Sequence, residues 1–299
     1  MMPTDKLRLP TYGGQALLEG VLMRGSHYAA AAFRKPDGEI VIHAEELTGI
    51  YKTRAAKTPF LRGIVILLDA LVLGTHFLVI SANHHTGEDE KIEGAALYGT
   101  LAFSLIIGIG VFFVIPALIA GVFEKYWALS SFTSNMIEGV IRLAFFLIYI
   151  WAIGKLPDIS RFFAYHGAEH KTINAYEANV DLTSEQVSQF SLYHPRCGTG
   201  FLLIVVIISI VIFALLGPLS ILFRILTRII FLPIIVILAY EYMRWTANHL
   251  DSPIIKILIS PNLLLQKLTT REPSNEMLDV AITALRQLIE LENNYSVKS

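Results

Sequence analysis

Three residues that could carry chemistry stand close together in the sequence, because His166, Glu169 and His170 form the pattern H-x-x-E-H. On an α-helix, residues four apart lie about 40° apart around the axis and one turn along it, so both imidazoles can bind one metal ion. Glu169 would lie near the same face and could take a proton from a water molecule there. The spacing is that of the inverted zinc-protease motif. It predicts a zinc site with Glu169 as catalytic base, although histidines at this spacing can also form hydrogen bonds alone.

A zinc site needs at least one further protein ligand, and the sequence leaves two sources open. His194 and Cys197 precede an apolar run, and with the two motif histidines they would form a closed His3Cys site of structural character. Glu241, near the end of a later apolar segment, would instead complete a His2Glu site with one position left for water. Glu241 could equally form an ion pair with Arg244.

Cys197 has a second interpretation as a nucleophile. It is the only cysteine of the chain, it follows Arg196, and it lies at the expected start of a helix. A neighbouring cation and a helix N-terminus both lower the pKa of a thiol. A single cysteine also excludes an intrachain disulfide and a cysteine-rich zinc cluster.

The composition places these residues in a membrane protein. Hydrophobic residues make up 54% of the 299 residues and charged residues 16%, against roughly a quarter charged in soluble proteins. The net charge of −1 provides no basic field for a nucleic-acid partner. The bilayer itself is therefore the first expected partner.

Apolar segments long enough to cross a bilayer, which requires about 20 residues, occur four times. A fifth candidate, Gly63–Ala82, carries a polar stripe that repeats every seven residues, which is typical of an interfacial or re-entrant helix. The stripe consists of Arg62, Asp69, His76 and Asn83. We therefore expect a mainly α-helical polytopic bundle with spans near 99–123, 137–156, 198–223 and 226–245.

Positive charge sets the expected orientation. Residues 1–62 contain nine Lys and Arg residues, and cytoplasmic segments carry such an excess. With four spans, the 157–199 loop, which holds the H-x-x-E-H motif, lies on the same side. Both termini and the motif are therefore predicted to be cytoplasmic.

Outside the apolar segments, the sequence predicts a β-rich part and two further helices. Residues 11–47 read as a small antiparallel sheet, with Asp37-Gly38 at a hairpin turn. The run 254–268 fits an amphipathic helix on the membrane face, and Ser274 can cap a final soluble helix. The expected division is 1–62 (cytoplasmic, β-rich), 63–253 (membrane domain) and 254–299 (C-terminal helices).

Several longer motifs stand out in the sequence. They are Gly-Gly-Gln-Ala and Glu-Gly-Val-Leu-Met-Arg-Gly within 13–25, Tyr-His-Gly-Ala-Glu-His-Lys-Thr at 165–172, His-Pro-Arg-Cys-Gly-Thr at 194–199 and Thr-Arg-Glu-Pro at 270–273. These motifs resemble the YqhQ-like family of bacterial membrane proteins, which is labelled as a domain of unknown function. The resemblance covers nearly the whole chain. It implies a multi-pass protein of the bacterial inner membrane and a metal-dependent enzyme, without a substrate.

The sequence thus predicts a zinc-dependent hydrolase at the cytoplasmic membrane face, with a peptide or membrane protein as substrate. A scaffold or assembly protein with a structural His/Cys site is the alternative. A third interpretation is a transporter with polar residues inside the bilayer. Its residues would be Asp69, His76, Glu138 and Arg142.

Overall fold

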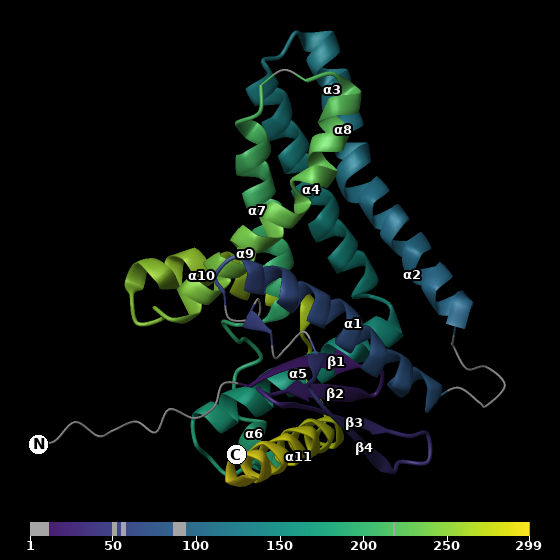
Figure 1. Cartoon of the computed structure of the whole chain (residues 1–299), viewed down its shortest axis with the longest axis vertical. Coiled ribbons are helices and arrows are strands. Elements are labelled where there is room, and N and C mark those ends of the chain that lie inside the picture. Colours follow the sequence, from purple (N-terminus) through teal and green to yellow (C-terminus); the bar gives the residue numbers. More distant parts are fainter. Residues whose placement is uncertain (1–11, 50–52, 55–57, 86–93, 218, 299) are drawn as a thin grey trace, which may run out of the picture.

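The computed structural model describes residues 12–49, 53–54, 58–85, 94–217 and 219–298, and they form a helical bundle that stands on a mixed layer of helices and one sheet (Figure 1). The bundle comprises α2 (Gly94–Ile109), the π-helix η4 (Gly110–Val114), α3 (Ile115–Trp127), α4 (Ser131–Ile153), α7 (Gly198–Ala214), α8 (Ile221–Ile230) and α9 (Leu232–Ala247). The layer contains α1 (Leu61–Asn83), α5 (Pro157–Glu177), α6 (Ser184–Val187) and α11 (Asn275–Lys298), and α10 (Pro253–Thr269) lies at the boundary.

The predicted N-terminal sheet is confirmed. It has four antiparallel strands in the order β1-β2-β3-β4, namely β1 (Gly13–Leu17), β2 (Gly20–Arg24), β3 (Tyr28–Arg34) and β4 (Ile40–Glu46). The Asp-Gly signal is at the β3–β4 turn, where the N–H of Gly38 donates to the carbonyl of Lys35 at 2.9 Å and Gly38 has a φ of 92°. Glycine adopts this left-handed conformation without steric cost.

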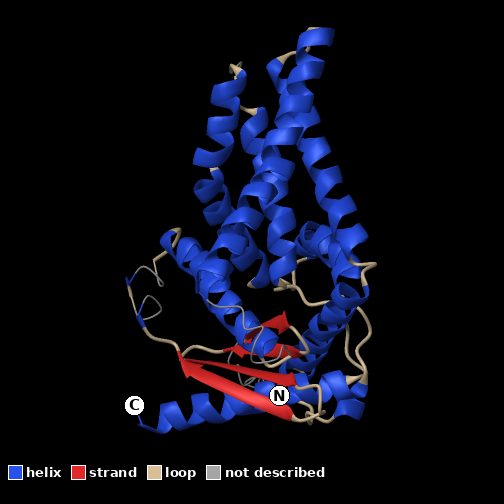
Figure 2. Ribbon diagram, turned by 90° about the vertical axis from the view of Figure 1, so that its right-hand side faces the viewer, coloured by secondary structure: helices blue, strands red, loops and turns tan. Residues whose placement is uncertain are grey.

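Helices cover both faces of the sheet (Figure 2). Along β3, Ala29, Ala31 and Phe33 face Phe77 of α1, and the alternate alanines face α5 and α11. Successive residues of a strand point to opposite faces, which is why β3 is apolar throughout. The expected C-terminal helix is confirmed as α11, and its apolar stripe packs on the sheet. The N-terminal sheet and the last helix thus share one core.

Two bundle helices are long and apolar enough to cross a membrane: the continuous helix Leu97–Trp127, with 31 residues, and Ser131–Ile153, with 23. The pair α8 and α9 would add a third span, bent by 42°. α7 is apolar but has only 17 residues. Large apolar side chains project outward from the bundle, such as Phe103 and Ile106, which are 66% and 67% exposed. Such a surface is typical of contact with lipid.

Charged side chains are buried inside the bundle. Glu138 and Arg142 of α4 lie with Arg228 of α8, and all three are 1% exposed. The Oε2 atom of Glu138 is 2.6 Å from a guanidinium nitrogen of Arg228. Arg142 donates to the carbonyl of Phe112 in the π-helix at 2.9 Å. The four residues of the transporter interpretation therefore do not all lie together, since His76 pairs with Glu45 of the sheet. The side chain of Asp69 is outside the described part of the chain.

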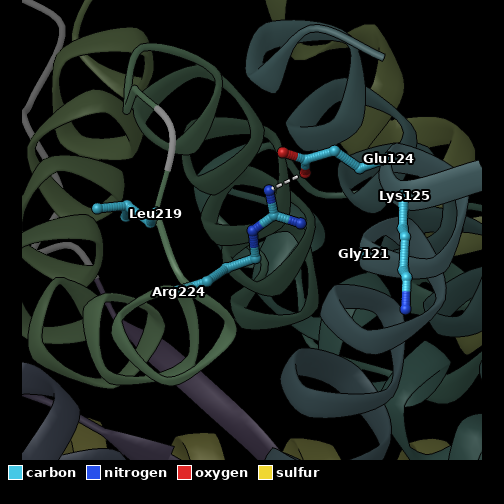
Figure 3. A pocket seen from close by; sticks show the side chains of 5 residues that line it. All are labelled: Gly121, Glu124, Lys125, Leu219 and Arg224. Atoms are coloured by element: carbon cyan, nitrogen blue, oxygen red, sulfur yellow. Dashed lines mark hydrogen bonds and ion pairs between the residues drawn. The ribbon is translucent and has the colours of Figure 1, made fainter. Parts of the chain in front are cut away.

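A second buried arginine pairs farther along the bundle, between α3 and α8 (Figure 3). Arg224 of α8 is 3% exposed and forms an ion pair with Glu124 of α3. It also donates to Ser134 at 3.2 Å. Gly121, Lys125 and Leu219 complete the small pocket around this pair. The arginines of α8 thus each find a glutamate on a neighbouring helix.

The carboxylate of Glu292 links α11 to the β2–β3 turn. Glu292 accepts from the N–H groups of His27 and Tyr28 at 2.7 and 3.0 Å and contacts the His27 ring at 2.9 Å. A Cβ on Gly25 would lie 2.3 Å from the same carboxylate, so a side chain there would displace it. Burial raises the pKa of Glu292, but these hydrogen bonds bring it below the usual value.

We expect Glu292→Gln to lower the free energy of unfolding by about 1–2 kcal/mol at neutral pH, because a neutral amide oxygen accepts more weakly than a carboxylate from the N–H groups of His27 and Tyr28. Since the folded pKa is lowered, this contribution is present above the usual carboxylate pKa of about 4.3 and is lost as pH falls further. Thermal unfolding should show a smaller difference between the two proteins in acid. A constant difference across that range would contradict the assignment.

Candidate metal centre

The motif helix α5 is buried along its middle, from Phe163 to Ile173. It packs against β1, β2 and α11, and His166 links it to the end of α10 and to Cys197 at the start of α7. The Nδ1 atom of His166 is 2.8 Å from the carbonyl of Thr269, and that of His170 is 2.6 Å from the carbonyl of Leu192. Such bonds fix the orientation of metal-binding histidines, and here they direct both Nε2 atoms to one point.

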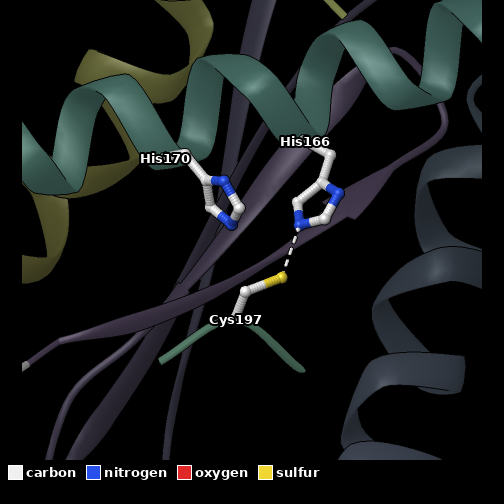
Figure 4. A group of neighbouring side chains, drawn as sticks. All are labelled: His166, His170 and Cys197. Carbon is white, nitrogen blue, oxygen red and sulfur yellow. Dashed lines mark hydrogen bonds between the residues drawn. The ribbon is translucent and has the colours of Figure 1, made fainter. Parts of the chain in front are cut away.

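Cys197 completes a group with the two motif histidines (Figure 4). Its Sγ atom is 3.2 Å from Nε2 of His166, and the three ligand atoms all lie within 4.8 Å of one another. The ring centroids of His166 and His170 are 4.4 Å apart. Two imidazole nitrogens and one thiolate are ligands that zinc accepts.

One nitrogen atom in this group lacks a hydrogen-bond partner, and a metal ion could bind to it. The Nε2 atom of His170 is buried and has no hydrogen-bond partner, and the residue is 1% exposed. An unsatisfied buried polar atom costs about 1–3 kcal/mol. The geometry of the three side chains therefore fits a bound zinc ion.

Glu169 lies beside these ligands. Its Oε2 atom is 3.8 Å from Nε2 of His166 and 3.7 Å from Nε2 of His170. The residue is 5% exposed, and burial raises the pKa of its carboxyl group. Glu169 thus lies near the helix face that carries His166 and His170, as the sequence predicts.

The two other candidate ligands lie elsewhere. The ring of His194 is near that of His170, with centroids 5.9 Å apart, but its Nε2 atom faces Glu177 at 3.5 Å. Glu241 forms an ion pair with Arg62 and accepts from the N–H of Phe60 at 3.0 Å, and so joins α9 to α1. Among the described residues, the group therefore has three ligands, and neither His194 nor Glu241 belongs to it.

Two glycines and one glutamine also shape the site. Gly14 of β1 allows the close approach of Glu169, since a Cβ there would lie 2.5 Å from its Cγ atom. Gly167 does the same for the chain after α10, because a Cβ would lie 2.2 Å from the carbonyl of Arg271. Gln266 holds both backbone polar groups of His194, each at 2.9 Å. Gly14 belongs to a Gly13-Gly14 pair that is evident in the sequence, but its contact with Glu169 could not be predicted from the sequence.

The comparisons with known proteins agree with the resemblance seen in the sequence. A family model described as "Protein of unknown function (DUF1385)" matches residues 58–291. The chain is 34% identical over 303 residues to "Uncharacterized protein YqhQ" of Bacillus subtilis (strain 168), which covers 95% of this chain and 93% of that protein. No solved structure matches the chain. The chain therefore belongs to the DUF1385 family of proteins of unknown function.

Proposed function

We propose that the chain is a multi-pass membrane protein and a zinc-dependent hydrolase that acts at the cytoplasmic membrane face. The observation that carries this proposal is the set of three converging ligand atoms beside a buried carboxylate. Catalytic zinc sites keep three protein ligands and one open position, whereas structural sites have four. His166, His170 and Cys197 would hold the ion.

The residues around the ion have separate tasks. A zinc ion at this position would lower the pKa of a coordinated water molecule to about 7. Glu169, beside both histidines, would accept a proton from that water and deliver it to the leaving group. The carbonyls of Thr269 and Leu192 keep the histidine rings in place. Buried surroundings strengthen these electrostatic interactions.

The surroundings support a substrate that arrives from the membrane. α10 ends at Thr269, next to His166, and it exposes apolar side chains such as Ile254 and Ile257, which are 67% and 72% exposed. An amphipathic helix of this kind lies in the membrane interface. Together with the positive charge of residues 1–62, this favours a bacterial inner-membrane protein with both termini cytoplasmic and a peptide or membrane protein as substrate.

One observation favours the alternative of a scaffold protein with a structural metal site. His170 is 1% and Cys197 is 6% exposed, so a substrate reaches the ion only if the contacts around the site open. In a scaffold, the ion would instead join α5 to the start of α7. The two functions differ in the role of Glu169, which a structural site does not need.

The test is a comparison of N-terminal peptides from membranes of cells that produce the wild-type protein, Glu169→Gln or Glu185→Gln. A hydrolase should yield cleavage products that Glu169→Gln reduces by about 100-fold or more, the usual effect of losing a general base. Glu185 is exposed on α6 and provides the matched control. Equal products in all three, with equal zinc contents, would favour the scaffold.

The contact between Gly14 and Glu169 provides a second variant for the same assay. Gly14→Ala should displace the Glu169 carboxylate and lower product formation by up to about 100-fold, as a misplacement of about 1 Å can do. Zinc content should stay unchanged. Gly13→Ala is the control, because a Cβ at Gly13 meets nothing within 4 Å. Equal loss in both variants would show an effect on the strand rather than on Glu169.

A further inference from the structure

A second group of potential metal ligands lies on the opposite face of the sheet from α5. His43 and Glu45 are two residues apart on β4 and so point to the same side, and His76 projects from α1 toward them. The Nε2 atom of His43 is 2.8 Å and that of His76 is 2.9 Å from the same Oε1 atom of Glu45. Two imidazoles from different elements thus converge on one carboxylate oxygen.

A buried aromatic ring packs against both imidazoles. Phe77 is 0% exposed, and its ring meets those of His43 and His76 edge to face, each with centroids 5.6 Å apart. The three polar side chains are 41%, 38% and 50% exposed for His43, Glu45 and His76. The group therefore has an apolar base and an open side that water and ions can reach.

We propose that His43, Glu45 and His76 form a second binding site, for a divalent transition-metal ion of the zinc class. Their ligand atoms all lie within 4.8 Å of one another. Zinc takes nitrogen and carboxylate ligands at about 2.0–2.2 Å in a tetrahedron, so modest rotation of the side chains suffices. Water from the open side would fill the remaining position.

The electrostatics of the group suit a cation. Burial raises the pKa of Glu45, but the hydrogen bonds from His76 and His43 outweigh it and keep the carboxyl ionised. When the two imidazoles are neutral, each offers one lone pair, and the group carries a single negative charge. To bind a divalent ion through Nε2, each neutral imidazole carries its proton on Nδ1, and the hydrogen bonds to Glu45 give way to bonds to the ion.

This site differs from the buried group in a way that an experiment can detect. It has no sulfur ligand, and it joins β4 to α1, which is the helix that contacts both the sheet and α9. An ion there would fasten α1 to the sheet. The buried group joins α5 to the start of α7 and contains Cys197.

The test is cobalt and zinc titration of the full-length protein in detergent, with His43→Ala, His76→Ala and, as the control, His249→Ala. His249 is exposed and lies outside both groups. We expect two equivalents in the wild-type protein and the control, and one equivalent in His43→Ala and His76→Ala. The thiolate-to-cobalt charge-transfer band reports the buried group alone. Its persistence in these two variants would show that they are folded.

Hydrogen exchange gives a second measurement. Zinc should slow exchange of the amides in the second half of α1 in the wild-type protein, and this effect should disappear in His43→Ala. The proposal is overturned if His43→Ala and His76→Ala keep the stoichiometry of the wild-type protein. It is also overturned if the wild-type protein binds a single equivalent that Cys197→Ala removes. Failure of the buried site alone, seen as a missing charge-transfer band with one equivalent that depends on His76, would leave this proposal supported.

Discussion

His170→Ala should abolish the thiolate-to-cobalt band and the stabilisation that zinc gives through the buried group. A ligand that binds only the folded state stabilises it by about 4 kcal/mol when its free concentration is 1,000 times the dissociation constant. The wild-type protein should therefore lose several degrees of Tm when a chelator is added. In His170→Ala the chelator should have a smaller effect, which the exposed group of His43, Glu45 and His76 alone provides, because His166 and Cys197 alone bind zinc weakly.

The physical reason for choosing His170 is its position. The Nε2 atom of His170 is buried without a partner, so the apo protein already carries the cost of an unsatisfied group. His84→Ala provides the control, since His84 is exposed, directly follows α1 and bonds to the carbonyl of Ile80 in the last turn of that helix. If the cobalt band and the chelator effect are equal in the wild-type protein and His170→Ala, the buried metal centre is wrong.

The part of the site that could be predicted from the sequence is local. The four-residue spacing of His166 and His170 fixes their common face once the segment is a helix, and the strands and the last helix follow from short-range periodicity. The choice among His194, Cys197 and Glu241 could not be predicted in this way. It depends on how the start of α7 and the ends of α9 and α10 pack around α5, which is a matter of contacts distant in sequence.

The helices of the bundle show the same division. The apolar runs of the sequence predict that these helices exist, but they do not predict where the helices end or bend. α7 ends at Ala214, before the predicted limit of 223. α8 and α9 meet at a 42° bend, and Pro233 at the start of α9 explains it, because proline lacks the N–H that would continue the helix. No pattern in the sequence predicts the π-helix. In the structure, the carbonyl of Phe112 in this helix accepts a hydrogen bond from Arg142.

The buried charges of the bundle lead to the second large effect. Glu138 accepts from Arg142 at 2.5 Å and from Arg228 at 2.9 and 2.6 Å, so one carboxylate neutralises one of two guanidinium groups. Neutral partners take the remaining donors, among them Asn135 and Ser209. Removing one member of a buried ion pair costs about 3–5 kcal/mol, since it leaves an uncompensated charge.

We therefore expect Glu138→Gln to lower the free energy of unfolding by about 3–5 kcal/mol and to reduce the yield of folded protein in detergent. Glu124→Gln is the matched control at the other arginine of α8. Glu124 is 27% exposed, and water can replace part of its interaction with Arg224, so the loss should be smaller. Thermal unfolding in detergent measures both.

The double variant Glu138→Gln/Arg228→Gln separates charge from packing. It restores the net charge of the wild-type group, one uncompensated guanidinium, although it loses the four hydrogen bonds that Arg228 donates, two to Glu138 and one each to Asn135 and Thr227. If charge is what matters, the double variant should be more stable than Glu138→Gln alone, because two adjacent buried cations repel each other at low dielectric. A double variant that is less stable than the single one would mean that the neutral contacts of Arg228 outweigh the repulsion, namely its hydrogen bonds to Asn135 and Thr227 and its packing against Phe213, whose ring centroid lies 4.3 Å from its guanidinium carbon.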